Sequence, residues 1–203
     1  IENNVLKTFS IENEPVVELV NNREREYIFA DLPDIGYSTD IDTVMASSYQ
    51  VKKQLQQIVK IEQPITNTLL YKRILRIWNL TRVTTRLQVF IDNLLEDAYK
   101  DPLSGDTIIY WEDEEKAKDC DFYRINSKRD ILDIPILEVM SAARYAIEQQ
   151  ISMPTEDLKR LTSQLLGFSR KGNNLDMVTE QTIQLLIDQG IFSHANGMVS
   201  MNN

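Results

Sequence analysis

The stretch Leu70–Leu87, LYKRILRIWNLTRVTTRL, returns in altered form as Leu158–Leu175, LKRLTSQLLGFSRKGNNL. At a constant offset of 88 residues both stretches begin and end on leucine, and Arg82 aligns with Arg170. An internal repeat of this kind determines how the rest of a chain is divided. The repeat predicts two copies of one small helical module.

The first copy has the apolar spacing of three helices followed by a hairpin. Val51, Leu55 and Ile58 lie on one helical face, and Leu70 and Ile74 begin a second such face. A Thr66 cap opens the second helix, Asn79 turns the chain in a left-handed conformation, and a Thr81 cap opens the third. The β-rich run 107–111 follows. This order is that of a winged helix-turn-helix.

The second copy repeats the order. A helix is expected over 136–151, then a Thr155 cap, a Gly167 turn and a third helix capped by Ser169. Asn196-Gly197 between two apolar runs is a strong hairpin signal. The fold class is therefore predicted to be mostly α with small β-hairpins, built as tandem winged-helix modules.

Four segments follow from this interpretation. Residues 1–43 form an irregular N-terminal lead-in, because proline, glycine and scattered aspartates break regular structure there. Module 1 spans 44–111 and module 2 spans 136–203. An acidic linker, 112–135, joins them and carries a strand near Phe122–Ile125.

The composition and hydropathy of the sequence predict neither a membrane-spanning segment nor a secretory signal. An apolar run of about 18 residues is absent, and the start carries no basic and apolar leader. The single cysteine, Cys120, fits a reducing compartment, so a cytoplasmic location is expected. We expect no membrane partner.

The net charge of −9 is unevenly distributed. Between Tyr71 and Phe90 there are five cations and no acid, whereas Asp92 to Asp121 holds eleven acids and three cations. A dedicated nucleic-acid binder is usually basic overall. A local basic patch in module 1 is still compatible with an acidic protein.

Catalytic motifs are absent from the sequence. One histidine, His194, and one cysteine offer neither a zinc-finger set nor a Cys–His pair, and no glycine-rich nucleotide loop occurs. The acids 112–115 are interpreted as a solvated loop, because four adjacent carboxylates rarely converge on one cation. We expect no catalytic residue, no metal and no cofactor.

The shared arginines suggest a nucleic-acid surface. In helix-turn-helix proteins the third helix enters the major groove and its first turn contacts phosphates and base edges. The predicted contact residues are Lys72, Arg73, Arg76, Arg82, Thr84, Thr85, Arg86 and Gln88 in module 1, and Arg170 and Lys171 in module 2. Asn173 and Asn174 stand beside the second set.

Two alternatives stay open. The shared arginines can serve the fold, for example by bonding the carbonyls at the end of the preceding helix. The acids of the first wing, Asp101 among them, would repel phosphate, and many winged helices bind proteins instead. A protein–protein or intramolecular docking module is therefore the rival interpretation.

Short motifs also resemble a known tail domain. The phrases are IVKIEQPIT at 58–66, LLYKRI at 69–74, WNLTRV at 78–83, the extended segment 27–30 and LGFSRKG at 166–172. They are similar to an uncharacterised domain at the C-terminus of large bacterial superfamily I DNA/RNA helicase-type proteins, which often carry a restriction-endonuclease-like domain.

The resemblance covers most of residues 27–192 and supplies no catalytic residue. It implies a non-catalytic accessory domain attached to a nucleic-acid-translocating ATPase. The expected partners are DNA or RNA at module 1 and the remaining domains of the helicase polypeptide, and a homodimer is left open.

Overall fold

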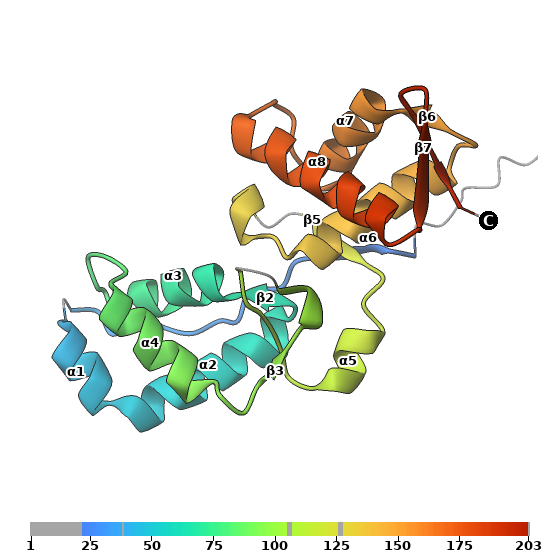
Figure 1. Cartoon of the computed structure of the whole chain (residues 1–203). Helices are drawn as coiled ribbons and strands as arrows, with labels where there is room; N and C mark the ends of the chain where they lie inside the picture. Colours follow the sequence, from blue (N-terminus) through green and yellow to red (C-terminus); the bar gives the residue numbers. More distant parts are fainter. Residues whose placement is uncertain (1–21, 38, 105–106, 126–127, 203) are drawn as a thin grey trace, which may run out of the picture.

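The computed structural model describes residues 22–37, 39–104, 107–125 and 128–202, and the first half of the expected lead-in lies outside them. Over this range the protein is mostly helical, with three small β-sheets (Figure 1). No helix in the described ranges is long and apolar enough to cross a membrane.

Two sets of elements follow the same order. The first set is α2 (Ser48–Glu62), β2 (Ile65–Thr66), α3 (Asn67–Ile77), α4 (Thr85–Leu94), β3 (Tyr99–Lys100) and β4 (Ile109–Trp111). The second set is α6 (Ile136–Glu148), β6 (Met153–Pro154), α7 (Thr155–Leu165), α8 (Asn173–Asp188), β7 (Phe192–Ala195) and β8 (Met198–Met201).

The sheets of the two sets share one topology. Their strand orders are β2-β4-β3 and β6-β8-β7, with antiparallel pairing throughout. The first residues of α2, β2, α3 and α4 lie 88 positions before those of α6, β6, α7 and α8. The predicted internal repeat is therefore present in the structure as a repeat of helices and strands.

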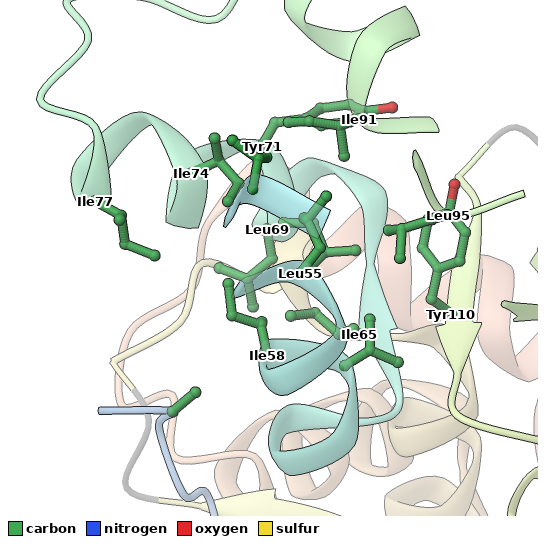
Figure 2. Packing of buried hydrophobic residues seen from close by; sticks show 14 of the residues in the cluster. Leu55, Ile58, Ile65, Leu69, Tyr71, Ile74, Ile77, Ile91, Leu95 and Tyr110 are labelled. Atoms are coloured by element: carbon green, nitrogen blue, oxygen red, sulfur yellow. The ribbon is translucent and has the colours of Figure 1, made fainter. Parts of the chain in front are cut away.

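The first set encloses the larger apolar core. Side chains from α2, α3, α4, β2 and β4 converge on one centre (Figure 2). Leu55, Ile58, Leu70, Ile74 and Ile91 are fully buried. In the second set Ala143 and Ala146 stand at the positions of Leu55 and Ile58, so α6 presents a smaller apolar face.

The left-handed turns predicted after α3 and α7 are present. Asn79 has a φ of 48° and its repeat partner Gly167 a φ of 89°. Asn and Gly tolerate this left-handed conformation better than other residues, and it lets the chain leave the helix. Asn196 and Gly197, with φ of 52° and 75°, form the predicted tight turn between β7 and β8.

Three predicted helix caps are wrong. The third helix of the first set begins at Thr85, and the cap is Thr84, whose hydroxyl accepts from the Leu87 amide, rather than Thr81. The chain first passes through a loop whose Val83 packs against the core. That apolar anchor delays the start of the helix.

In the second set the corresponding cap is Gly172, not Ser169, and α8 begins at Asn173. Thr155 is the first residue of α7 and follows Pro154 as the flanking residue. The Thr155 amide and hydroxyl both donate to the Gly197 carbonyl of the β7–β8 turn, so this hydroxyl does not cap the helix. The Thr66 cap is confirmed, since its hydroxyl accepts from the Leu69 amide.

The flanking segments are more ordered than expected. Within the lead-in, β1 (Glu24–Glu26) and α1 (Ile41–Ala46) form. The linker contains α5 (Glu114–Lys118), the predicted strand as β5 (Tyr123–Ile125), and a short 3-10 helix η2 (Ile131–Asp133). Another 3-10 turn, η1 (Pro102–Ser104), follows β3. Strands β1 and β5 pair in parallel.

A buried ion cluster joins the two sets of elements. The carboxylate of Glu138, at the start of α6, is fully buried and pairs with Arg124 of β5 and with Arg129, whose two terminal nitrogens lie 2.7 and 2.8 Å from it. Arg124 also donates to the backbone carbonyls of Glu62, Gln63 and Pro64. One guanidinium thus links the end of α2 to the start of α6.

The N-terminal segment completes this joint. The Tyr27 ring lies beneath both guanidiniums, 4.7 Å from Arg124 and 4.2 Å from Arg129. Its hydroxyl donates to the buried carboxylate of Glu62, which also accepts from the Ala30 amide. Residues far apart in the chain therefore share one buried, hydrogen-bonded network.

Replacing Glu138 by glutamine should strongly destabilise the protein. Two buried guanidiniums would lose their counter-ion, which typically costs about 3–5 kcal/mol. Urea unfolding followed by circular dichroism measures this loss. The matched control is Glu115→Gln on exposed α5, which should change the free energy of unfolding by less than about 0.5 kcal/mol. Equal stabilities for the two variants would contradict the assignment.

The same carboxyl predicts a pH dependence. Burial acts to raise the pKa of Glu138, but the ion pairs with Arg124 and Arg129 outweigh it and hold that pKa below its ordinary value. The unfolded chain then takes up this proton first as the pH falls. The contribution is present above about pH 4.3 and is lost below it. The difference in the free energy of unfolding between wild type and Glu138→Gln should therefore become smaller as the pH falls below about 4.3.

Candidate nucleic-acid interface

Helix α4 and the turn before it present exposed side chains on the surface of the first set of elements. Arg86, Val89 and Asn93 form an exposed stripe along α4. Arg82 is exposed in the turn, as is Thr85 at the first position of the helix. These side chains could contact a ligand without rearrangement of the core.

Two of the predicted contact residues on α3 are held by internal ion pairs. Lys72 lies with its Nζ 2.6 and 2.7 Å from the carboxylate oxygens of Asp133 in η2. Arg73 pairs with the buried Glu62 at 2.8 Å and also donates to the Ala30 carbonyl. The basic window of the sequence therefore contributes in part to the joint between the two sets of elements.

Arg76 differs from its neighbours on α3. Its side chain is exposed and lines a hollow between α3 and residues 29–34. Neither Arg76 nor Arg82 has an ion-pair partner among the described residues. Among the described cations of α3, α4 and the turn between them, these two guanidiniums are the ones without an ion-pair partner.

The remaining polar residues of the first set have unequal exposure. Thr84 is half-buried because its hydroxyl caps α4, so it serves the fold. Gln88 is half-buried on the same helix. Arg86 is exposed, and its guanidinium lies 2.8 Å from the carboxylate of Asp42 in α1. Helix α1 thus reaches the exposed stripe of α4.

The second set places its cations mainly before α8. Arg170 and Lys171 are exposed in the loop between α7 and α8 and line a hollow of about 190 Å³. Along α8 itself the exposed stripe is neutral, with no lysine or arginine in the helix, and consists of Asn173, Asn174, Met177, Gln181 and Gln184.

Lys159 lies between three carboxylates beside this stripe. Its Nζ is 2.7 Å from Asp176, 3.3 Å from Glu156 and 3.6 Å from Glu180. Desolvation acts to lower the pKa of Lys159, and the hydrogen bonds with Asp176 and Glu156 raise it above its ordinary value. The ammonium is therefore committed to the link between α7 and α8.

The repeat preserves this helix-to-helix link with different chemistry. Tyr71 stands 88 positions before Lys159, and Asp92 stands 88 positions before Glu180. The Tyr71 hydroxyl donates to the Asp92 carboxylate at 2.7 Å, and burial together with this carboxylate raises the pKa of the phenol. Both pairs align at the offset of 88 residues, but the contact within each pair becomes visible only in the structure.

Several acids in and after the β3–β4 hairpin have partners within the chain. Asp101 is buried, and it accepts from the indole Nε1 of Trp111 at 3.1 Å and from the Leu103 amide. Glu112 pairs with Lys116, and Glu114 with Lys118 at 2.9 Å. Lysines of the same segment thus compensate part of its negative charge.

Metal and thiol chemistry find no site in the described ranges. No group of three or more histidine, cysteine or acidic side chains there is arranged to hold a metal ion. Burial raises the pKa of the Cys120 thiol to about 12, which disfavours the thiolate form near neutral pH.

Comparison with known proteins gives one partial match. A family model described as "Protein of unknown function (DUF3320)" matches residues 46–89, which include α2, β2, α3 and the first turn of α4. No curated protein and no solved structure matches the chain. The chain is thus similar to an uncharacterised domain over residues 46–89 of its first set of elements.

Alanine substitutions should separate the structural arginines from the free ones. Arg73→Ala leaves the buried Glu62 carboxylate without its cation and should cost about 3 kcal/mol or more. Arg82→Ala removes an exposed side chain and should cost less than about 0.5 kcal/mol. Chemical denaturation of both variants measures the difference. Similar losses would show that Arg82 also serves the fold.

Proposed function

We propose that the two sets of elements are tandem winged-helix modules of a non-catalytic accessory domain that contacts nucleic acid. Module 1 corresponds to 44–111 and module 2 to 136–203, joined by 112–135. The order of three helices and a hairpin in each set, with the first strand paired to the last, supports the winged-helix interpretation.

The observation that carries the proposal is the position of the unpaired cations. Arg82 in one copy and Arg170 in the other are exposed in the turn before the third helix, and Lys171 stands beside Arg170. Phosphates bind at this position of a helix-turn-helix through basic side chains and helix amides. Arg76, in the last turn of α3, adds a further cation near the turn of module 1.

The proposed context is a helicase-type polypeptide. The sequence resemblance to a C-terminal tail domain suggests it, and the partial match to an uncharacterised domain family agrees with that resemblance. In this proposal the motor domains translocate on DNA or RNA, and the winged helices add contacts with the backbone. The remaining domains of the polypeptide are then the second partner.

Fluorescence anisotropy with a labelled DNA duplex tests the nucleic-acid role. We expect weak binding at low salt that falls as salt rises, because phosphate neutralisation releases counter-ions. Arg82→Ala and Arg170→Ala should each weaken binding and lower the salt slope by about one. Lys118→Ala, which removes an exposed cation from acidic α5, is the control and should bind like wild type.

A docking function is the second candidate. Lys72, Arg73 and Arg86 form internal ion pairs, and the net charge is −9. Under this alternative the exposed stripes of α4 and α8 contact other domains of the polypeptide. Absence of duplex binding at low salt, together with salt-insensitive association with the separately produced remaining domains, would favour docking.

A further inference from the structure

The segment before module 1 lies across its helix-turn-helix. The Ile35 amide donates to the Ile77 carbonyl at 3.0 Å, and the Thr39 hydroxyl donates to the Trp78 carbonyl. These carbonyls belong to the end of α3, where a helix leaves its acceptors without internal partners. We call the described residues 30–37 and 39–46, the last six of which form α1, the strap.

The strap carries carboxylates to the most basic part of the chain. It contains Asp31, Asp34, Asp40 and Asp42. Asp31 and Asp34 line the hollow that Arg76 also lines. The Asp42 carboxylate lies 2.8 Å from the guanidinium of Arg86, which belongs to the exposed stripe of α4.

We infer that the strap is an autoinhibitory cover, in which the Asp42 carboxylate takes the place of a nucleic-acid phosphate on Arg86. This inference rests on the proposed nucleic-acid role of module 1. Val44 is fully buried in the core of module 1 and anchors α1, so Asp42 stays beside Arg86. A tethered competitor of this kind acts at a high effective concentration.

The cover is easily released. Asp42 and Arg86 are both exposed, with side chains 73% and 57% accessible. Exposed ion pairs of this kind contribute little to stability and are screened by salt. An incoming polyanion can therefore displace one carboxylate from Arg86 without unfolding the strap.

A double-mutant cycle in the full chain tests the inference, with duplex affinity measured by anisotropy at low salt. Asp42→Asn should tighten binding by about two- to five-fold, the range that a surface ion pair can supply. In an Arg86→Ala background the same substitution should have no such effect. The Arg86→Ala loss should in turn be larger in Asp42→Asn than in wild type.

Asp97→Asn is the matched control. Asp97 is an exposed carboxylate paired with exposed Lys52 at 3.2 Å, so its substitution changes net charge equally. Equal tightening by Asp42→Asn and Asp97→Asn would overturn the cover and leave only a general charge effect. Tightening by Asp42→Asn that persists without Arg86 would also overturn it. Failure of every variant to bind would instead reject the proposed nucleic-acid function.

Discussion

The structure depends on one buried carboxylate, Glu138, held between Arg124 and Arg129. A charge removed from water is tolerated only when partners satisfy it, and here those partners come from the segment that joins the two repeats. Arg124 extends the constraint to the carbonyls at the end of α2. The end of α2 in the first set of elements is consequently linked to the start of α6 in the second.

Much of the fold could be predicted from local pattern. The apolar faces of the helices and the left-handed turns at Asn79 and Gly167 depend on neighbours within a few positions, and the offset of 88 residues is visible in the sequence itself. These predictions are confirmed. Helix starts were less predictable, because Thr81 and Thr84 are equally good caps in isolation. The apolar anchor Val83, which decides between them, acts through the tertiary core.

The candidate site was predictable only as a list of side chains. Sequence grouped Lys72, Arg73, Arg82 and Arg86 because they share a sign and a short window. Lys72, Arg73 and Arg86 pair with Asp133, Glu62 and Asp42, which lie elsewhere in the chain, and no periodicity connects the partners; Arg82 has no ion-pair partner among the described residues. The net charge of a sequence segment gives the number of cations that a surface can present. The fold decides how many of those cations are already paired with carboxylates.

The pairing of β1 with β5 has a consequence for how the chain folds. Arg23, next to β1, bonds Asp121, 98 residues away, and also Glu148 of α6. Closing so long a loop is entropically costly, whereas the helices within each set of elements are close together in sequence. We expect the two sets to form early and separately, and the N-terminal strand to close the joint as a late step.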